Sequence, residues 1–477
     1  MGTEHRRASA PSPERDAALF ALSARNRAQM ERTGVQPALY LMTFGCQMNL
    51  SDAELVAGLM SEADYRLTEQ LEEADLVVIH TCGVREGAET RVMGRIGQLK
   101  TLKASKPDLL IAVGGCMTQQ PAVAEQIRTI HRHVNLIFGT HNQAQFAELL
   151  WQSVQHHGPL VALAEPTAIE EGLPRLRKDP RSAWVSIMFG CNNYCSYCIV
   201  PYLRGPERSR EPQAILAEIR QLVADGVVEV TLLGQNVNSY GRGLAEDIDF
   251  ADLLVQVAAI PGIERLRFVT SHPRDMSNKL IAAMAASANV CRQLHLPVQA
   301  GSNRILQQMN RGYTKEHYLG VVAKLKAAMP DITLTTDIIV SFPGETEEDF
   351  SETLDIVRQV RFDNAFTFVY SPRPGTPAAL MENTIPQETT QRHMEQLLAL
   401  QSSIALEHNR KLVGQRVRVL VESLGKSGES MLLGRGEDHK VVNFVGPEEW
   451  IGTFQWVEIT EAASYHVLGR VCPGPQD

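Results

Sequence analysis

The chain has 477 residues, of which 44% are hydrophobic and 21% charged, a composition typical of an ordinary globular protein. Its length predicts about three domains, and no apolar run is long enough to span a membrane. The formal net charge of −9 disfavours nucleic-acid binding through the global field, so an RNA-binding surface has to be a local basic patch. Eight cysteines and an N-terminus without a signal-peptide core predict metal ligation in a reducing, cytoplasmic compartment.

The first part of the chain alternates strands and helices after a polar start. We expect residues 1–36 to form a flexible extension, although Ala17–Arg32 could form a helix. Residues 37–155 predict a parallel α/β sheet with right-handed crossovers. The expected strands are Ala38–Phe44, Leu76–His80, Leu109–Val113 and Leu136–Thr140, and the expected helices are Asp52–Glu62, Arg85–Lys103, Pro121–Ile130 and Gln143–Gln155.

A cysteine follows each of the first three strands, at Cys46, Cys82 and Cys116. The carboxyl ends of parallel strands lie at one edge of a sheet, and neighbouring strands are about 4.8 Å apart. Three thiols placed in this way could bind one inorganic cluster. Each cysteine could instead be a small buried hydrophobe, but three equivalent placements favour ligation.

A poorly periodic linker over 156–181 leads through the apolar run Ala183–Phe189 to the cysteine loop Cys191-Asn-Asn-Tyr-Cys195-Ser-Tyr-Cys198. A 4Fe–4S cluster normally takes four thiolates, so three leave one iron open for another ligand. The open position distinguishes a catalytic cluster from an electron carrier. Zinc binding is the alternative, but zinc motifs usually contain paired C-x2-C units with four ligands, which this loop lacks.

Strands and helices alternate again over 182–407, which predicts an incomplete parallel barrel with its active site at the carboxyl ends of the strands. Arg204, Arg208 and Arg210 follow the cysteine loop near that face. They could bind phosphates or a cofactor carboxylate, and surface ion pairs are an equal alternative. The six expected strands are Ala183–Phe189, Glu229–Leu233, Arg265–Thr270, Gln293–Val298, Thr333–Val340 and Ala365–Tyr370.

The hydrophobic period changes to two in residues 408–474, after a helix near Glu388–Leu412. Short strands close together predict a small closed β-barrel. Its Arg435, Lys440 and Phe444 offer charge and an aromatic ring suited to single-stranded RNA. A packing cap is the alternative, and the pattern alone does not separate the two. The expected strands are Arg416–Glu422, Met431–Arg435, Val441–Phe444 and Gln455–Thr460.

Eight stretches together resemble the radical-SAM methylthiotransferase family, in its tRNA-modifying branch. Ala300, Gly436 and His439 depart from the family's usual residues. The matching stretches are Thr43–Asn49, His80–Glu86, Gly114–Met117, Gly190–Pro212, Leu232–Gly241, His295–Ser302, Asp337–Phe350 and Tyr370–Ala379.

The resemblance implies a methylthiotransferase N-terminal domain with an auxiliary cluster (37–155), a radical-SAM core with a partial (β/α)6 TIM-like barrel (182–407) and a TRAM domain (408–474). It also implies a reaction. A methylthio group replaces hydrogen at the 2-carbon of N6-isopentenyl (dimethylallyl) adenosine at position 37 of tRNA. Alternative substrates are threonylcarbamoyladenosine in tRNA and a ribosomal-protein aspartate. An alternative of another class is a non-catalytic iron–sulfur RNA-binding protein.

The cofactors implied by the resemblance are two [4Fe–4S] clusters, with Cys46, Cys82 and Cys116 as one ligand set and Cys191, Cys195 and Cys198 as the other, and S-adenosylmethionine. No catalytic residue is expected beyond these ligands. The implied partners are the tRNA anticodon loop, an electron donor such as a flavodoxin or ferredoxin, and a sulfur or cluster delivery system, with no membrane. The expected S-adenosylmethionine contacts are Tyr197, Gly234, Gln235, Asn236 and Gln299, and the expected RNA contacts are Arg204, Arg208, Arg210, Arg435 and Lys440.

Overall fold

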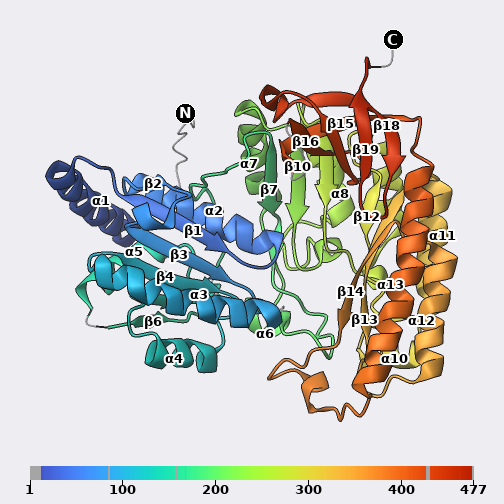
Figure 1. Cartoon of the computed structure of the whole chain (residues 1–477), viewed down its shortest axis with the longest axis horizontal. Helices are drawn as coiled ribbons and strands as arrows, with labels where there is room; N and C mark the ends of the chain where they lie inside the picture. The colour runs from blue at the N-terminus through green and yellow to red at the C-terminus, as the bar shows by residue number, and fades with distance from the viewer. Residues whose placement is uncertain (1–11, 84–85, 157, 167, 426–429, 475–477) are drawn as a thin grey trace. The chain divides into compact units, whose positions relative to one another are not determined.

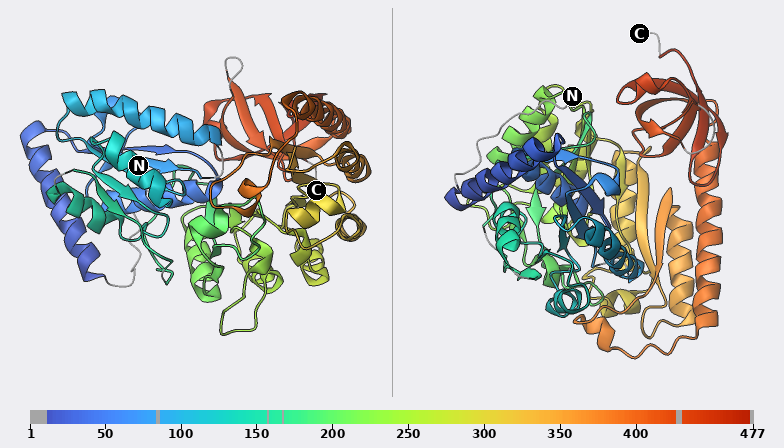
Figure 2. Two further views of the ribbon diagram at one scale, coloured as in Figure 1. Left: turned by 90° about the horizontal axis from the view of Figure 1, so that it is seen from below. Right: turned by 60° about the vertical axis from the view of Figure 1, so that its left-hand side comes forward.

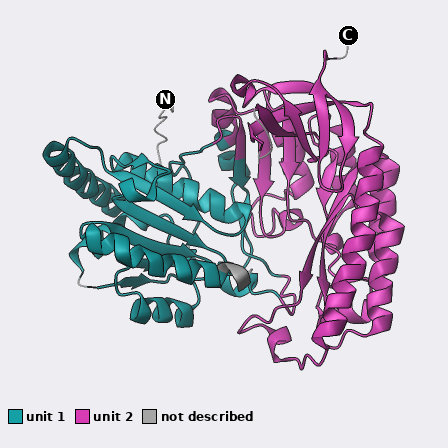
Figure 3. Cartoon of the chain, viewed as in Figure 1, with its two compact units in different colours: residues 1–178, 184–192, 198–218 teal, residues 179–183, 193–197, 219–477 magenta. Residues whose placement is uncertain are grey.

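The computed structural model describes residues 12–83, 86–156, 158–166, 168–425 and 430–474 (Figure 1). Two compact units divide the chain (Figure 3). The first unit comprises residues 1–178, 184–192 and 198–218, and the second comprises 179–183, 193–197 and 219–477. No helix in the described ranges is both long and apolar enough to cross a membrane.

A six-stranded sheet forms the centre of the first unit, in the order β2-β1-β3-β4-β5-β6, and every neighbouring pair is parallel. β3 and β4 are buried along their whole length because helices cover both faces of the sheet, which explains their nearly continuous apolar sequences. The predicted parallel α/β sheet is confirmed. The strands are β1 (Ala38–Thr43), β2 (Arg66–Leu67), β3 (Leu76–Thr81), β4 (Leu110–Gly115), β5 (Leu136–Phe138) and β6 (Leu160–Ala162).

Helices lie on both faces of this sheet (Figures 1 and 2), and two apolar layers pack between the sheet and these helices, one on each face. The first contains residues of α2 and α5, and the second contains residues of α3 and α4. α2 begins directly after Cys46, five residues earlier than predicted from the apolar pattern of Asp52–Glu62. The start predicted for α3, at residue 85, lies outside the described ranges. The helices are α2 (Gln47–Glu62), α3 (Glu86–Ser105), α4 (Pro121–Ile130) and α5 (Phe146–Gln155).

The flexible N-terminal extension is contradicted by helix α1 (Pro13–Thr33). The Ser12 hydroxyl accepts a hydrogen bond from the backbone N–H of Arg15 and caps the helix, which ends at Gly34 in the left-handed conformation. Leu19 and Leu22 are buried in the same apolar layer as α2 and α5. The expectation of a flexible extension is therefore wrong for residues 13–33, while residues 1–11 lie outside the described part of the chain.

The central region contains two three-stranded sheets, β11-β10-β7 and β12-β13-β14, in which the pairs β10–β11, β12–β13 and β13–β14 are parallel. A parallel bridge between Leu266 and Val290 leads from β11 toward β12, so the strands follow one another in chain order as in a partial barrel. The predicted first strand is divided into β7 and β8, and β8 pairs with β9 instead. The strands are β7 (Ser182–Ser186), β8 (Met188–Phe189), β9 (Arg208–Ser209), β10 (Glu229–Leu233), β11 (Arg265–Phe268), β12 (Gln293–His295), β13 (Thr333–Val340) and β14 (Asn364–Val369).

Helices follow the strands of this partial barrel, as the sequence pattern predicts. Those of the second unit include α8, α9, α11 and α12, and the long α13 packs against β14. The bounds of the helices are α6 (Val200–Arg204), α7 (Pro212–Ala224), α8 (Phe250–Ala258), α9 (Asn278–Ala286), α10 (Asn303–Gln308), α11 (Lys315–Ala328), α12 (Glu347–Val360) and α13 (Gln387–Arg410).

The last segment is a closed barrel in the order β15-β16-β17-β19-β18, the red group of strands in Figure 2. Alternate side chains such as Val419, Val421 and Phe444 fill its interior. The predicted closed barrel is confirmed, and the strand that the sequence pattern misses is β19, which is short and half exposed. The strands are β15 (Arg416–Leu424), β16 (Met431–Arg435), β17 (Val441–Val445), β18 (Phe454–Ala462) and β19 (Val467–Val471).

Candidate active site

The first three cysteines lie just beyond the carboxyl ends of adjacent strands, as predicted. Cys46 is the N-cap of α2 after β1, and Cys82 and Cys116 directly follow β3 and β4. Gly45 has φ +112°, and a Cβ atom there would lie 2.7 Å from Cβ and 2.9 Å from Sγ of Cys82. The backbone beside Cys46 thus approaches the Cys82 thiol so closely that only glycine fits.

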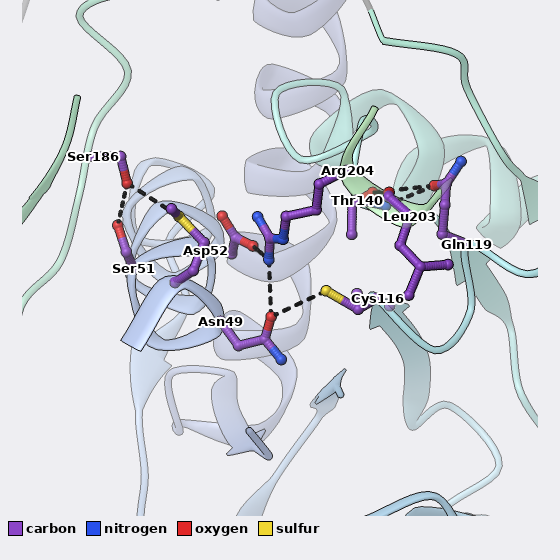
Figure 4. Close-up of polar contacts among 12 residues, drawn as sticks. Asn49, Ser51, Asp52, Cys116, Gln119, Thr140, Ser186, Leu203 and Arg204 are labelled. Carbon is purple, nitrogen blue, oxygen red and sulfur yellow. Dashed lines mark hydrogen bonds and ion pairs between the residues drawn. The ribbon is translucent and has the colours of Figure 1, made fainter. Parts of the chain in front are cut away.

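Asn49, one turn after Cys46, connects the ends of these strands. Its buried amide donates hydrogen bonds to the carbonyls of Phe44 at 2.7 Å and Thr81 at 2.8 Å. Its Oδ1 atom lies 3.7 Å from Sγ of Cys116, within the range of a thiol hydrogen bond (Figure 4). The sequence analysis assigned no role to Asn49. The signal in the sequence was an amide residue three positions after a predicted ligand cysteine.

Arg204 is buried beside the same cysteines. Its Nη2 atom donates to Oδ2 of Asp52 at 2.8 Å and to Oδ1 of Asn49 at 3.0 Å. Burial raises the pKa of the Cys116 thiol to about 11, and the charge of Arg204 opposes this shift. Burial alone would lower the pKa of Arg204, but Cys116, Asp52 and Cys46 outweigh it and raise that pKa. Arg204 thus places a fixed positive charge beside the thiols and favours their thiolate forms.

The segment that follows the C-x3-C-x2-C loop packs onto this first group of cysteines within the first unit. Cys116 forms a buried apolar cluster with Ile199 and Leu203, and Ile199 is the residue after Cys198. The Leu203 carbonyl also accepts a hydrogen bond from the Thr140 hydroxyl at 2.7 Å (Figure 4). The end of the loop is therefore anchored beside Cys116.

The loop itself begins at a constrained glycine. Gly190 has φ +79°, and a Cβ atom there would lie 2.0 Å from the Pro206 carbonyl oxygen. Within the first unit, Cys191 is buried and its N–H donates to the Gly205 carbonyl at 3.1 Å, while Cys198 is half-buried. The turn into the loop therefore requires glycine on grounds of both conformation and space.

In the second unit, buried Arg311 donates from Nη1 to Sγ of Cys195 at 3.3 Å. The neighbouring Ser196 donates from its N–H to the Met309 carbonyl at 3.0 Å and from its hydroxyl to the Gln308 carbonyl at 2.7 Å. The charge of Arg311 interacts with the phenol of Tyr197. The sequence analysis missed Arg311, which lies 116 residues from Cys195 and has no recognisable spacing to it.

Two further segments of the expected cofactor site lie after strands of the second unit. Gly234, Gln235 and Asn236 follow β10, and Gln299 follows β12 in the left-handed conformation with φ +69°. The Gln299 N–H donates to the Asp337 carbonyl at 2.9 Å, and its own carbonyl accepts from the Ile339 N–H at 2.9 Å. These positions agree with a site at the carboxyl ends of the strands, and their contacts with S-adenosylmethionine stay predictions.

The chemistry of the donors fits iron–sulfur clusters better than a single metal ion. In the part of the chain that the structure describes, no group of three or more His, Cys, Asp or Glu side chains is arranged around one ion. In a [4Fe–4S] cluster each thiolate binds a different iron, so its cysteines need not converge on one point. Both cysteine groups offer thiols, and an arginine lies beside a thiol of each, Arg204 near Cys116 and Arg311 at Cys195, which suits a negatively charged cluster.

Three family models match the chain: the radical SAM superfamily over residues 185–357, the uncharacterized protein family UPF0004 over 38–139 and the TRAM domain over 410–472. A tRNA-2-methylthio-N(6)-dimethylallyladenosine synthase of Thermoanaerobacter sp. (strain X514) is 49% identical over 442 residues, or 92% of this chain and 94% of the relative. A synthase of the same name from Acetivibrio thermocellus is 51% identical over 447 residues, or 92% of each chain. The chain belongs to the tRNA-2-methylthio-N(6)-dimethylallyladenosine synthase family.

Similar solved structures share little sequence identity with this chain, so they support its fold and nothing further. A radical S-adenosylmethionine methyltransferase, TsrM from Kitasatospora setae, has a TM-score of 0.53 at 15% identity, covering 82% of this chain and 79% of its own. The cobalamin-dependent S-adenosylmethionine radical enzyme OxsB has a TM-score of 0.52 at 13% identity, covering 81% and 60%. Both agree with the radical-SAM fold predicted from the sequence.

Two of the arginines expected to contact RNA, Arg204 and Arg210, pair with acidic side chains inside the protein. Arg204 is 5% exposed and bound to Asp52, and Arg210 is 6% exposed, with Nη2 2.8 Å from Oε2 of Glu218. Arg210 also donates to the Ser186 carbonyl at 2.6 Å. The expectation that these two arginines present their charges to RNA is therefore corrected, because both charges are satisfied inside the protein.

Arg208 lies on β9 and is half-buried. It lines a cavity of about 120 Å³ in the first unit, together with His141, Gln143 and Arg175. Burial lowers the pKa of Arg208 and lowers that of His141 to about 4. A contact between Arg208 and RNA stays a prediction.

The two expected RNA contacts of the last barrel both form ion pairs, Lys440 with Asp363 of the radical-SAM region and Arg435 with Glu422 of the barrel itself. Lys440 Nζ lies 3.0 Å from Oδ1 of Asp363, and Arg435 Nε lies 3.1 Å from Oε1 of Glu422. The Lys440 side chain is only 15% exposed. Lys440 thus holds the barrel to the connection between α12 and β14, whereas Arg435 is 30% exposed and its RNA contact stays a prediction.

Proposed function

We propose that this chain is a radical-SAM methylthiotransferase that converts dimethylallyladenosine at position 37 of tRNA to its 2-methylthio derivative. One structural observation carries the proposal. Cys116, the last member of the first cysteine group, packs on Ile199, the residue directly after Cys198 of the second group. A sulfur-insertion reaction needs two such centres close together, whereas an electron carrier would complete the ligation of its cluster.

Cys191, Cys195 and Cys198 would hold the [4Fe–4S] cluster that binds S-adenosylmethionine, and Cys46, Cys82 and Cys116 would hold an auxiliary [4Fe–4S] cluster. When bound, these groups supply the radical chemistry and the sulfur that acid–base catalysis cannot provide at an aromatic C–H bond. We retain the domain boundaries 37–155, 156–181, 182–407 and 408–474 as part of the proposal.

The protein's own residues position and charge the two cysteine groups. Asn49 holds the chain after Cys46 against the ends of β1 and β3, since its amide donates to both carbonyls there. Arg204 in the first group and Arg311 in the second place a buried positive charge beside a thiol. A guanidinium stabilises a neighbouring thiolate, which is the form of cysteine that binds iron, so each arginine favours cluster binding.

The substrate base has to leave the anticodon loop to reach these residues, and single-stranded loops are where proteins can contact bases. The barrel of residues 408–474 would bind the RNA on surfaces other than Lys440. An electron donor such as a flavodoxin or ferredoxin and a sulfur or cluster delivery system complete the proposal, and its location is the cytoplasm.

Mass spectrometry of tRNA nucleosides from a deletion strain tests this function. We expect 2-methylthio dimethylallyladenosine to disappear and its unthiolated precursor to accumulate. Wild-type protein and the Cys291→Ala variant should restore the product, because Cys291 is a buried core residue outside both groups, and Cys82→Ala should not. Loss of the 2-methylthio form of threonylcarbamoyladenosine instead, or of methylthio-aspartate in a ribosomal protein, would favour the alternative substrates. Absence of 5′-deoxyadenosine with reductant and S-adenosylmethionine would indicate a non-catalytic protein.

A further inference from the structure

The open face of the β12-β13-β14 sheet carries two exposed aromatic side chains. Phe366 is 50% exposed and Phe368 41% exposed, although both lie in the middle of β14. In the parallel register Phe366 is paired with Asp337 and Phe368 with Ile339. The alternate residues of β13, Ile338 and Val340, are fully buried, so the phenylalanines lie on the opposite face of the sheet. In a barrel with helices outside, that is the inner face.

This aromatic shelf, which we define as Ile339, Phe366 and Phe368, adjoins the expected cofactor site. The Ile339 N–H donates to the Gln299 carbonyl, and the parallel bridge pairs Gln299 with Ile338 on one side of β13. Phe368 is paired with Ile339 on the other side. Neighbouring strands are about 4.8 Å apart, which separates Gln299 from Phe368 by about 10 Å. That distance is comparable to the length of an adenine ring with an alkenyl chain on its amino group.

The polar end of the shelf is acidic. His295 Nε2 lies 3.4 Å from Oδ2 of Asp337, and His295 Nδ1 lies 3.0 Å from the Thr335 hydroxyl. The His295 ring also meets Phe366 edge-on, with 5.9 Å between ring centroids. The Asp337 side chain is 28% exposed. An anionic group placed on the shelf would therefore be close to a carboxylate, while an uncharged apolar chain would meet two aromatic rings.

We propose that Phe366 and Phe368 receive the dimethylallyl chain of the substrate adenosine and select it over a threonylcarbamoyl group. The inference rests on the proposed function, since it names the residues that recognise that substrate. The five-carbon chain is uncharged and fits the apolar shelf, and each fully buried methylene strengthens binding roughly fourfold. The threonylcarbamoyl group carries a carboxylate, which Asp337 repels.

Binding of anticodon stem–loop RNAs to the cluster-loaded full chain tests the proposal. Fluorescence anisotropy measures Kd for three RNAs with dimethylallyladenosine, unmodified adenosine or threonylcarbamoyladenosine at position 37. We expect wild type to bind the dimethylallyl RNA about tenfold more tightly than unmodified RNA. The Phe366→Ser/Phe368→Ser variant should reduce that preference to less than about twofold, mainly by raising Kd for the dimethylallyl RNA. Phe368→Leu should keep most of the preference, because leucine retains an apolar surface.

Phe20→Ser is the matched control, since Phe20 is 77% exposed on α1 and far along the chain from the shelf. The proposal is overturned if the double variant keeps the wild-type preference, if wild type has no preference, or if wild type binds the threonylcarbamoyl RNA as tightly as the dimethylallyl RNA. The melting temperature of each variant is measured alongside. If the double variant lacks a folding transition, the single variants decide, and each should lose about threefold of the preference.

Failure of the proposed function gives a different result. In that case the wild-type protein forms no 2-methylthio nucleoside from the dimethylallyl RNA under reducing conditions with S-adenosylmethionine. Failure of the shelf proposal alone leaves wild-type product formation intact while the Phe366 and Phe368 variants still discriminate between the RNAs.

Discussion

Arg204 and Asp52 form a buried ion pair beside the first cysteine group, with 2.8 Å between Nη2 and Oδ2 and side chains 6% and 10% exposed. Removal of one partner leaves the other charge buried and unpaired, which costs about 3–5 kcal/mol. We therefore expect Arg204→Met to lower the free energy of unfolding of the apoprotein by about that amount in denaturant titrations.

The matched control for this pair is Arg128→Met. Arg128 pairs with Glu125 at 2.6 Å on the surface, where both side chains are about half exposed. An exposed pair of this kind contributes less than about 1 kcal/mol. Equal losses from the two substitutions would contradict the role assigned to Arg204.

Gly45→Ala should disturb the first cysteine group. The new Cβ would lie 2.9 Å from Sγ of Cys82, so the thiol has to move. We expect the iron content of the reconstituted protein to fall from about eight to about four per chain. Gly34→Ala is the control, because Gly34 also has a positive φ but no atom within 4 Å of the added Cβ. It should cost about 1 kcal/mol of stability and no iron.

Arg267→Met should loosen the contact between the last barrel and β11. Arg267 is buried and donates to the carbonyls of Gly436 and Glu437, at 2.8 Å each. Without these bonds we expect amide hydrogen exchange over residues 436–440 to accelerate at least tenfold, equivalent to about 1.4 kcal/mol. Arg292→Met, which removes an exposed pair with Asp331, should leave that exchange unchanged. Unaltered protection in Arg267→Met would refute the docking role.

The raised pKa of Glu345 predicts that the stability of the protein depends on pH. Burial raises the pKa of Glu345 to about 7. The hydrogen bond that its Oε2 atom accepts from the Ser341 N–H at 2.6 Å opposes part of this rise. The unfolded value is near 4.5. The folded state therefore holds the proton more tightly, and the stability from protonated Glu345 is fully present below pH 4.5 and lost as pH rises through 7.

The glutamine in Glu345→Gln cannot ionise. The free energy of unfolding of this variant should therefore exceed that of wild type by more at pH 8 than at pH 5.5. The difference should be on the order of 2 kcal/mol, or a few degrees in melting temperature. Glu395→Gln, an exposed position on α13, should show no such difference. A Glu345→Gln advantage that is equal at both pH values would contradict the raised pKa.

The sequence predicted the three-part architecture and the position of the first cysteine group because β1, β3 and β4 are apolar runs that end in Gly or Thr before a cysteine. It did not predict the burial of Arg204 and Arg210. Asp52 lies 152 residues from Arg204, and Glu171 lies 39 from Arg210, so only the folded chain brings these partners together.

Other differences arise from weak local patterns. The apolar residues of α1 are mostly alanines among many charged and polar residues, and Leu19 and Leu22 are buried only because they pack in the same apolar layer as α2 and α5. The Arg267 contacts with the barrel join segments 169 and 170 residues apart through backbone carbonyls, which no side-chain pattern records. The ion pair between Lys440 and Asp363 could not be predicted because the two residues lie far apart in the sequence and no spacing relates them.

Iron and sulfide counting after anaerobic reconstitution tests the central claim most directly, with the two cysteine groups removed in turn. The wild-type chain should bind about eight irons and eight sulfides. Replacement of Cys46, Cys82 and Cys116 by alanine, or of Cys191, Cys195 and Cys198, should each leave about four. If either triple variant keeps the wild-type iron content, that group binds no cluster and the account of a two-cluster methylthiotransferase is wrong.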